Sequence, residues 1–200
     1  MKKKATKLVR KPTQAVKSAE QVERLERYLQ ERGQIYIDVW RVGCNTGLRI
    51  SDLLALKMKT VSDIDQSTGE IHIIEIKTGK QKTVVLNDRA LGVINRRVAD
   101  YPNDVFLFES SQRFDKHGQR SPVTRRQIAR VLEAGGKELS PKLHLSTHSM
   151  RKTRGYSLYK AGIDIHQIAK ALNHSSPATT MAYIGIDAEN VAKNIRDVLV

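Results

Sequence analysis

The residues best suited to chemistry lie in four short polar segments, and the first of them carries an arginine. Arg49 follows Gly47 at an expected helix start, and Asp52 lies three residues further on. A cation is mildly disfavoured at a helix N-terminus, so this arginine is expected to face an anion. Asp52 could hold the guanidinium in place. An ordinary surface pair of Arg49 and Asp52 is the alternative interpretation.

The second and third segments add lysines and a histidine. Lys77, Lys80 and Lys82 lie around a polar turn between two stretches rich in β-branched residues. A lysine there could reach a DNA backbone, although solvation alone also explains lysines at a turn. His148 and Arg151 are three residues apart, so on a helix they share a face and could donate to one phosphate. A capping histidine beside a surface arginine is the alternative.

The fourth segment runs from Ile163 to Tyr183. An Ile-Ala-x-x-Leu helix, a short turn and a Ser/Thr-rich helix are typical of a helix-turn-helix DNA-binding unit. The turn nevertheless holds His174, and the second helix ends on Tyr183. Taken alone, this segment favours a helix-turn-helix protein.

Composition limits the class of protein. The 200 residues suit one domain, and a formal charge of +14 with a pI of about 10.0 predicts a polyanionic partner, with nucleic acid first. An anionic membrane surface is second, because the basic residues do not gather on one amphipathic helix. No stretch is apolar enough to span a membrane. Cys44 is the only cysteine, which favours a reducing cytoplasm.

Hydrophobic periodicity and capping residues predict the elements that position these side chains. We expect a mainly α fold with one small antiparallel β-sheet, preceded by a flexible basic arm over residues 1–17. The domain would span residues 18–200, with no separate N-terminal DNA-clamping domain. Expected helices follow Ser18, Gly33, Arg49, Asn87, Thr124, Ser146 or Thr147, Asp164, Ser176 and residue 187. Residues 70–76 and 83–86 should form a hairpin, residues 61–64 an edge strand, and residues 109–122 an exposed loop.

In their order, the four segments resemble the phage integrase family of tyrosine recombinases. The pieces are Arg49-Ile50-Ser51-Asp52, a hairpin lysine, His148-x-x-Arg151, Leu172-Asn173-His174 and Thr179-Thr180-x-x-Tyr183. The resemblance covers roughly residues 18 to 195. It implies the tyrosine-recombinase catalytic-domain fold and a site-specific recombinase of the integrase or invertase type.

The resemblance also implies a catalytic set, which comprises Arg49, Lys77, His148, Arg151, His174 and Tyr183. The arginines would clamp the scissile phosphate, the tyrosine would attack it, and the lysine would protonate the leaving 5′ oxygen. The histidines would complete the active-site shell. Asp52 stands where the family usually has an acidic residue that braces the first arginine. Two departures are Asn173, where glycine is usual, and Lys152, where many members have histidine.

These residue types suit the reaction. Two arginines stabilise the charge of a pentacoordinate phosphorus with fixed bidentate donors. A tyrosine has a pKa of about 10, so it needs a base or a positive field. The product would be a 3′-phosphotyrosine, from which a DNA strand can be rejoined without ATP. No metal or other cofactor is required, and apart from a His144/His148 pair no histidine spacing suggests a metal site.

The expected partner is double-stranded DNA, bound by a homotetramer on paired sites, with an accessory DNA-bending protein as a further partner. The expected location is the cytoplasm, at the nucleoid, with no membrane. Candidate DNA contacts beyond the catalytic set are Lys80, Lys82, Arg125, Arg126, Arg130 and Lys152. Two alternatives stay open: a non-catalytic DNA-binding regulator or accessory factor with this fold, and a topoisomerase that nicks and reseals without exchanging strands.

Overall fold

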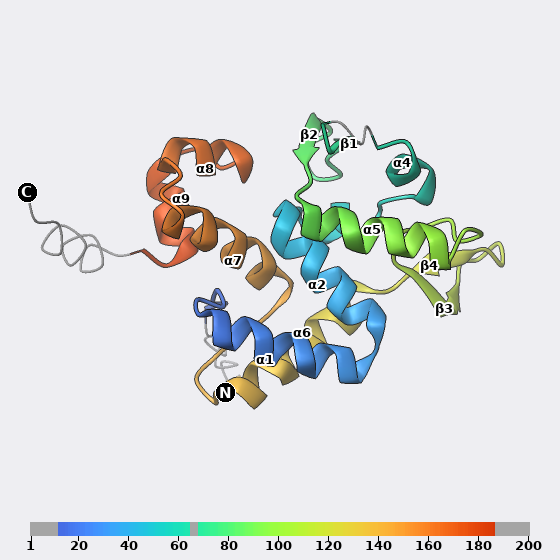
Figure 1. Cartoon of the computed structure of the whole chain (residues 1–200), viewed down its shortest axis with the longest axis horizontal. Helices are drawn as coiled ribbons and strands as arrows, with labels where there is room; N and C mark the ends of the chain where they lie inside the picture. Colours follow the sequence, from blue (N-terminus) through green and yellow to red (C-terminus); the bar gives the residue numbers. More distant parts are fainter. Residues whose placement is uncertain (1–11, 65–67, 187–200) are drawn as a thin grey trace, which may run out of the picture.

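Most of the described chain is helical, as the sequence predicts. The computed structural model describes residues 12–64 and 68–186 (Figure 1). The helices are α1 (Ala19–Arg32), α2 (Gln34–Thr46), α3 (Ile50–Leu54), α4 (Met58–Ser62), α5 (Asp88–Asp100), α6 (Arg125–Leu139), α7 (Thr147–Lys160), α8 (Ile165–Ala171) and α9 (Pro177–Ile184). No helix within the described ranges is long and apolar enough to cross a membrane.

Side-chain caps set the starts of these helices. The side chains of Ser18, Asp164 and Ser176 accept hydrogen bonds from backbone N–H groups of α1, α8 and α9, which confirms the expected caps. Ser146 rather than Thr147 caps α7. Each cap satisfies a donor that the helix itself leaves unpaired. At Gly47 the backbone turns left-handed (φ +64°), which ends α2 where a break is expected.

The expected hairpin is present. Strands β1 (Glu70–Ile74) and β2 (Gln81–Val85) pair antiparallel with Glu70 opposite Val85 and Ile74 opposite Gln81. Residues 75–80 form the connecting turn, so the polar Lys77 segment lies at the tip, as predicted. This tip extends toward α8 and α9 rather than toward α1 (Figure 1).

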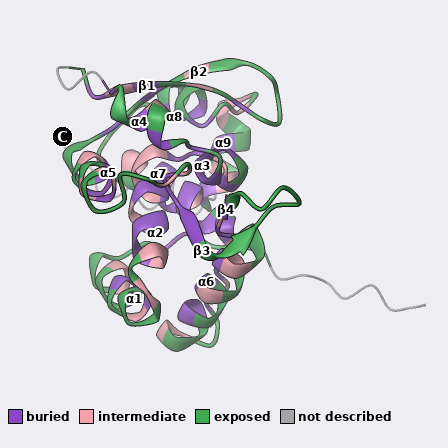
Figure 2. Cartoon of the chain, turned by 90° about the vertical axis from the view of Figure 1, so that its right-hand side faces the viewer, coloured by how far each residue is buried: buried purple, intermediate pink, exposed green. Residues whose placement is uncertain are grey.

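Two expectations for the remaining segments are wrong. Residues 109–122 form a second antiparallel pair, β3 (Glu109–Phe114) and β4 (Arg120–Pro122), in place of a loop. Its tip is polar and exposed, so the strands lack the alternating apolar pattern that would have identified them (Figure 2). Residues 61–64 are not an edge strand, because α4 occupies Met58–Ser62 and turns its apolar residues inward.

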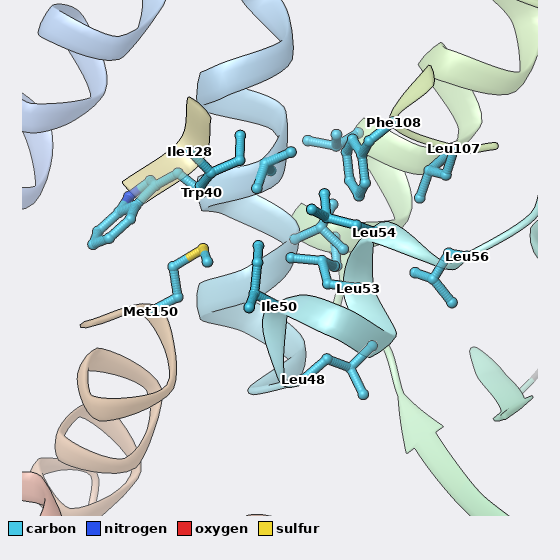
Figure 3. Packing of buried hydrophobic residues seen from close by; sticks show 14 of the residues in the cluster. Trp40, Leu48, Ile50, Leu53, Leu54, Leu56, Leu107, Phe108, Ile128 and Met150 are labelled. Atoms are coloured by element: carbon cyan, nitrogen blue, oxygen red, sulfur yellow. The ribbon is translucent and has the colours of Figure 1, made fainter. Parts of the chain in front are cut away.

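The buried apolar residues form two separate clusters. In the larger one, Trp40 of α2 lies beside Met150 of α7, and Leu53 and Phe108 continue the core toward α5 (Figure 3). At Gly43, a Cβ atom would lie 2.4 Å from Met150 Sδ, so α2 and α7 pack closely only because this residue has no side chain. The smaller cluster consists of Ile168, Leu172, Ile184 and Ile186.

Part of the expected arm is packed onto the domain. Ala15 and Val16 are buried, and the Val16 N–H donates to Thr153 Oγ1 of α7 at 2.9 Å. Lys17 Nζ donates to the Gly185 carbonyl at 3.0 Å, next to the end of α9. Residues 12–17 are therefore part of the folded unit. Residues 1–11 and the helix expected after residue 187 lie outside the described residues.

Candidate active site

Arg151 lies where α7, the end of α2 and the α8–α9 turn meet. Its guanidinium donates to the carbonyl oxygens of Gly47 and, at 2.6 Å, of Leu172, and the residue is only 3% exposed. No carboxylate among residues 12–64 and 68–186 forms an ion pair with it. Two carbonyls therefore fix the position of a buried cation whose charge lacks a direct counter-ion.

Burial lowers the pKa of Arg151, whereas a hydrogen bond to Tyr183 and that group's charge act in the opposite direction. The ordinary pKa of a guanidinium lies far above neutrality, so Arg151 stays charged. An uncompensated buried cation is costly, and an incoming anion would relieve that cost.

Tyr183, on the last turn of α9, is in contact with three of the expected site residues. Its hydroxyl lies 3.5 Å from His148 Nδ1, and its ring packs edge-on against His174 with the centroids 4.7 Å apart. Burial raises the pKa of Tyr183, although the charge of Arg151 and a hydrogen bond with it act to lower that pKa. The phenol is therefore neutral near pH 7 and needs a base.

The two histidines are held in their neutral forms. Burial, followed by the charges of Arg125, Arg151 and other cations, lowers the pKa of His148. Burial and the charges of Arg151, Arg49 and Lys82 lower the pKa of His174 to about 4. His174 Nδ1 also lies 3.1 Å from Thr180 Oγ1, which fixes the ring against α9. A neutral imidazole can accept a proton, and that is what an attacking phenol requires.

Arg49 is joined by a residue that the sequence did not single out. Its guanidinium donates to Glu75 Oε1 at 2.5 Å, and Glu75, at the start of the hairpin turn, is 1% exposed. Burial alone would raise the pKa of Glu75, but hydrogen bonds from Thr78 and Asn173 and the charges of Arg49 and Lys82 outweigh it and hold that pKa below its ordinary value. Glu75 is therefore a carboxylate at the site.

Asp52 has a different position from the one expected. Its Oδ1 accepts the backbone N–H of Ile76 at 3.0 Å, and its Oδ2 is buried without a hydrogen-bond partner among the described residues. It therefore anchors the hairpin turn, while Glu75 takes the contact with Arg49 that the spacing had suggested for Asp52. A partner 26 positions away along the chain cannot be inferred from i,i+3 spacing.

The departure at Asn173 has a geometric explanation. Its backbone is left-handed (φ +51°), a conformation that glycine adopts freely and that asparagine tolerates better than most residues. The side chain donates to Glu75 Oε2 at 2.8 Å.

The hairpin lysines differ in their surroundings. Lys77 and Lys80 are exposed at the tip, whereas Lys82 is half-buried and donates to the Ala171 carbonyl at 2.8 Å. Burial, followed by the charge of Arg151, lowers the pKa of Lys82. Lys82 is thus a hairpin lysine within electrostatic reach of Arg151. It also lines an open cavity of about 590 Å³ between β2 and α8.

The other expected DNA contacts fall into two groups. Arg125, Arg126 and Arg130 are exposed along α6, and the effect of Arg125 on His148 places the start of α6 near the site. Lys152 lies inside the protein surface instead, because its Nζ donates to the Tyr183 carbonyl and sits 4.7 Å from the ring centroid of that tyrosine. Its contacts hold α9 onto α7, and a role for Lys152 in DNA binding stays a prediction.

Together these residues form a cationic site that contains a neutral phenol. Two arginines, two neutral histidines and a phenol converge from α3, α7 and the α8–α9 segment. Such a set can bind an anion, accept a proton from the phenol and stabilise charge that develops during attack.

Comparisons with known proteins agree with this geometry. Residues 16–190 match the model of the phage integrase family. The chain is 31% identical over 176 residues to the probable integrase/recombinase YoeC of Bacillus subtilis, and the match covers 88% of this chain and 91% of YoeC. It is 26% identical to the tyrosine recombinase XerC of Pelobacter propionicus over 74% of this chain, but it spans only 46% of that relative.

Solved structures show the same fold. The crystal structure of XerA recombinase superposes with a TM-score of 0.71 at 20% identity, over 96% of this chain and 68% of that one. A lambda integrase dimer bound to a COC′ core site superposes with a TM-score of 0.67 at 16% identity, over 90% of this chain and 62% of that one. The mainly α fold expected from the sequence is therefore confirmed, and the chain belongs to the phage integrase family of tyrosine recombinases.

Proposed function

We propose that this chain is a site-specific DNA recombinase that cuts one strand of duplex DNA with Tyr183 and rejoins it. The observation that carries the proposal is the buried guanidinium of Arg151, which is fixed by two carbonyls, lacks an ion-pair partner among the described residues, and lies beside the Tyr183 hydroxyl. A DNA phosphate supplies the missing charge at the position where the phenol can attack.

The first step is attack by the Tyr183 oxygen on phosphorus. His148 Nδ1, 3.5 Å away, takes the phenolic proton, since burial and nearby cations keep this histidine neutral. A new P–O bond forms to the tyrosine, and the bond to the 5′ oxygen breaks. Arg151 and Arg49 stabilise the added negative charge, and removal of one such donor typically costs ~10²–10³ in rate.

The leaving 5′ oxygen needs a proton, which the hairpin supplies. Lys77 is the proposed general acid, and such catalysis is typically worth ~10²–10⁴-fold. It lies at the exposed tip, so it can meet DNA that lies over the site. Lys82, whose pKa the charge of Arg151 helps to lower, is the second candidate. Attack by a 5′ hydroxyl on the phosphotyrosine reverses the step and restores Tyr183.

The partner follows from the charge and from the relatives. Duplex DNA fits a chain of charge +14, and solved neighbours include integrases in complex with DNA. Assembly as a homotetramer on paired sites, an accessory DNA-bending protein, and a nucleoid location in the cytoplasm remain proposals. So does the division into an N-terminal arm and a catalytic domain, with the start of the domain moved from residue 18 to residue 12 or earlier, because residues 12–17 pack onto α7 and α9.

Covalent capture tests the function. The protein is incubated with supercoiled DNA that carries its native genomic flanks, and the reaction is stopped with SDS. We expect an SDS-resistant protein–DNA adduct from the wild type and none from Tyr183→Phe. Tyr101→Phe is the matched control, because Tyr101 is an exposed tyrosine at the end of α5. An adduct that survives in Tyr183→Phe would refute the assignment of the nucleophile.

The same assay separates the alternatives. A non-catalytic helix-turn-helix protein would bind the DNA without forming an adduct. The structure of α8 and α9 does not favour this alternative, because α9 brings Tyr183 into contact with His148 and His174. A topoisomerase would form the adduct and relax the plasmid. Only a recombinase would join strands from two labelled DNA duplexes, so that product distinguishes it.

A further inference from the structure

Glu75 is the meeting point of three segments that are far apart in the sequence. Its Oε1 accepts from Arg49 at 2.5 Å, and its Oε2 accepts from Thr78 Oγ1 and from Asn173 Nδ2, each at 2.8 Å. The carboxylate is 1% exposed. Each hydrogen bond to such a buried charge is of the stronger, charge-assisted kind. Glu75 therefore ties the start of α3, the hairpin turn and the α8–α9 turn together.

Backbone geometry does not explain why residue 173 is asparagine. Asn173 is the only non-glycine residue with positive φ within residues 12–64 and 68–186, and glycine would adopt φ +51° with less strain. What asparagine adds is the amide that reaches Glu75. The presence of asparagine at position 173 is therefore explained by the hydrogen bond of its side chain to Glu75 and not by the backbone of the turn.

The α8–α9 turn is bonded to both arginines of the site. The carbonyl of Leu172 accepts from Arg151, and the next residue, Asn173, reaches Arg49 through Glu75. Two consecutive residues thus set where the two guanidiniums stand relative to each other. His174 follows directly and packs against the Tyr183 ring.

We propose that Asn173 and Glu75 are positioning residues that hold Arg49 at the distance from Arg151 that the cleavage transition state requires. The proposal rests on the proposed function. Glu75 occupies one edge of the Arg49 guanidinium and leaves its other N–H groups for a phosphate. Asn173 keeps the Glu75 carboxylate in that orientation.

The charge of Glu75 should weaken DNA binding, whereas its hydrogen bond to Arg49 should speed cleavage, so the two effects can be measured separately. A carboxylate beside a phosphate-binding arginine weakens the attraction for DNA. If Glu75 serves geometry, Glu75→Gln binds DNA at least as tightly as the wild type but cleaves it more slowly. A residue that only supports the fold would not produce this split between binding and rate.

The experiment measures single-turnover cleavage of a nicked DNA duplex from which the released strand diffuses away. Asn173→Gly keeps the turn and removes only the amide. Because the lost hydrogen bond is made to a charged group, cleavage is expected to slow by about tenfold or more at unchanged DNA affinity. Asn173→Asp is expected to be slower still, because its carboxylate faces that of Glu75. In the Glu75→Gln background, Asn173→Gly should cost no more than about twofold.

Controls make each outcome decisive. Asn103→Gly, on the exposed turn after α5, should cleave like the wild type. The inference is wrong if Asn173→Gly cleaves at the wild-type rate, or if it slows cleavage by the same factor with and without Glu75→Gln. Either result would leave the proposed function intact. Absence of any Tyr183-dependent adduct from the wild type would overturn both.

Discussion

Replacing Arg151 with lysine keeps the positive charge but removes the planar fork that this site uses. The guanidinium donates to the carbonyls of both Gly47 and Leu172. The single ammonium of a lysine cannot donate to both carbonyls and to a phosphate at the same time. One buried carbonyl is left unpaired, at a cost of ~1–3 kcal/mol. For a 200-residue chain this corresponds to a melting temperature lower by about 2–12 °C.

The effect of Arg151→Lys on chemistry should be larger than its effect on folding. Loss of one fixed donor to a developing oxyanion typically slows a reaction by ~10²–10³. The assay is single-turnover adduct formation at saturating protein, with the folded fraction measured by thermal unfolding. At a temperature where the variant is folded, we expect cleavage to be slower by that factor.

Arg97→Lys is the matched control for Arg151→Lys. Arg97 is also 3% exposed and also donates to a backbone carbonyl, that of Leu107, but it belongs to the ion-pair network around Asp38. Its replacement should lower the melting temperature and leave the cleavage rate of the folded protein unchanged. The reasoning fails if Arg151→Lys cleaves within tenfold of the wild type, or if Arg97→Lys is slowed as strongly.

Three further predictions concern protons and salt. Burial, with nearby cations, lowers the pKa of His174 to about 4, so this histidine should stay neutral as the pH falls below 6.5 and kcat/KM should persist near pH 6. A loss of activity centred near pH 6.5 would contradict this. The same lowered pKa means that the folding stability present above pH 6.5 is lost progressively as the pH falls toward 4. If Lys77 protonates the leaving oxygen, Lys77→Ala should cleave an ordinary DNA substrate ~10²–10⁴-fold more slowly. Its cleavage rate should recover on a substrate with sulfur in place of the 5′ oxygen, because the thiolate leaves without a proton. If Lys82→Ala shows this loss and recovery instead, the general acid is Lys82. Arg126→Ala and Arg130→Ala should each reduce the salt-dependence slope of DNA binding by about 0.9 if they contact phosphates, and an unchanged slope would remove them from the interface.

The sequence predicted the elements of this fold where local signals determine them. Ser18, Asp164 and Ser176 cap their helices because a short polar side chain satisfies donors two or three residues away. The pair of strands β3 and β4 was missed because its exposed tip carries no apolar alternation. Local signals therefore predicted the capped helices, but they failed for the polar hairpin and for the short helix α4, which was expected as a strand.

The candidate site was predictable in its residues but not in its connections. The order of the motifs identified Arg49, Arg151, His148, His174 and Tyr183, and the structure brings them together. The carboxylate that holds the first arginine was not predictable, since its partners lie 26 and 98 positions away along the chain. Spacing along one helix favoured Asp52, whose side chain instead anchors the hairpin turn.

The division of the buried residues into two clusters has a consequence for how Tyr183 can move. Tyr183 packs against the smaller cluster, whereas Leu48, Ile50 and Met150, the chain neighbours of Arg49 and Arg151, belong to the larger one. The hydrogen bonds that connect α8 and α9 to the rest of the described domain include those of Arg151 to Leu172, Asn173 to Glu75, Lys82 to Ala171, Lys152 to Tyr183 and Lys17 to Gly185. If these hydrogen bonds break together, α8 and α9 can move as a unit, and amide hydrogen exchange there would proceed by a sub-global opening that leaves the larger cluster folded.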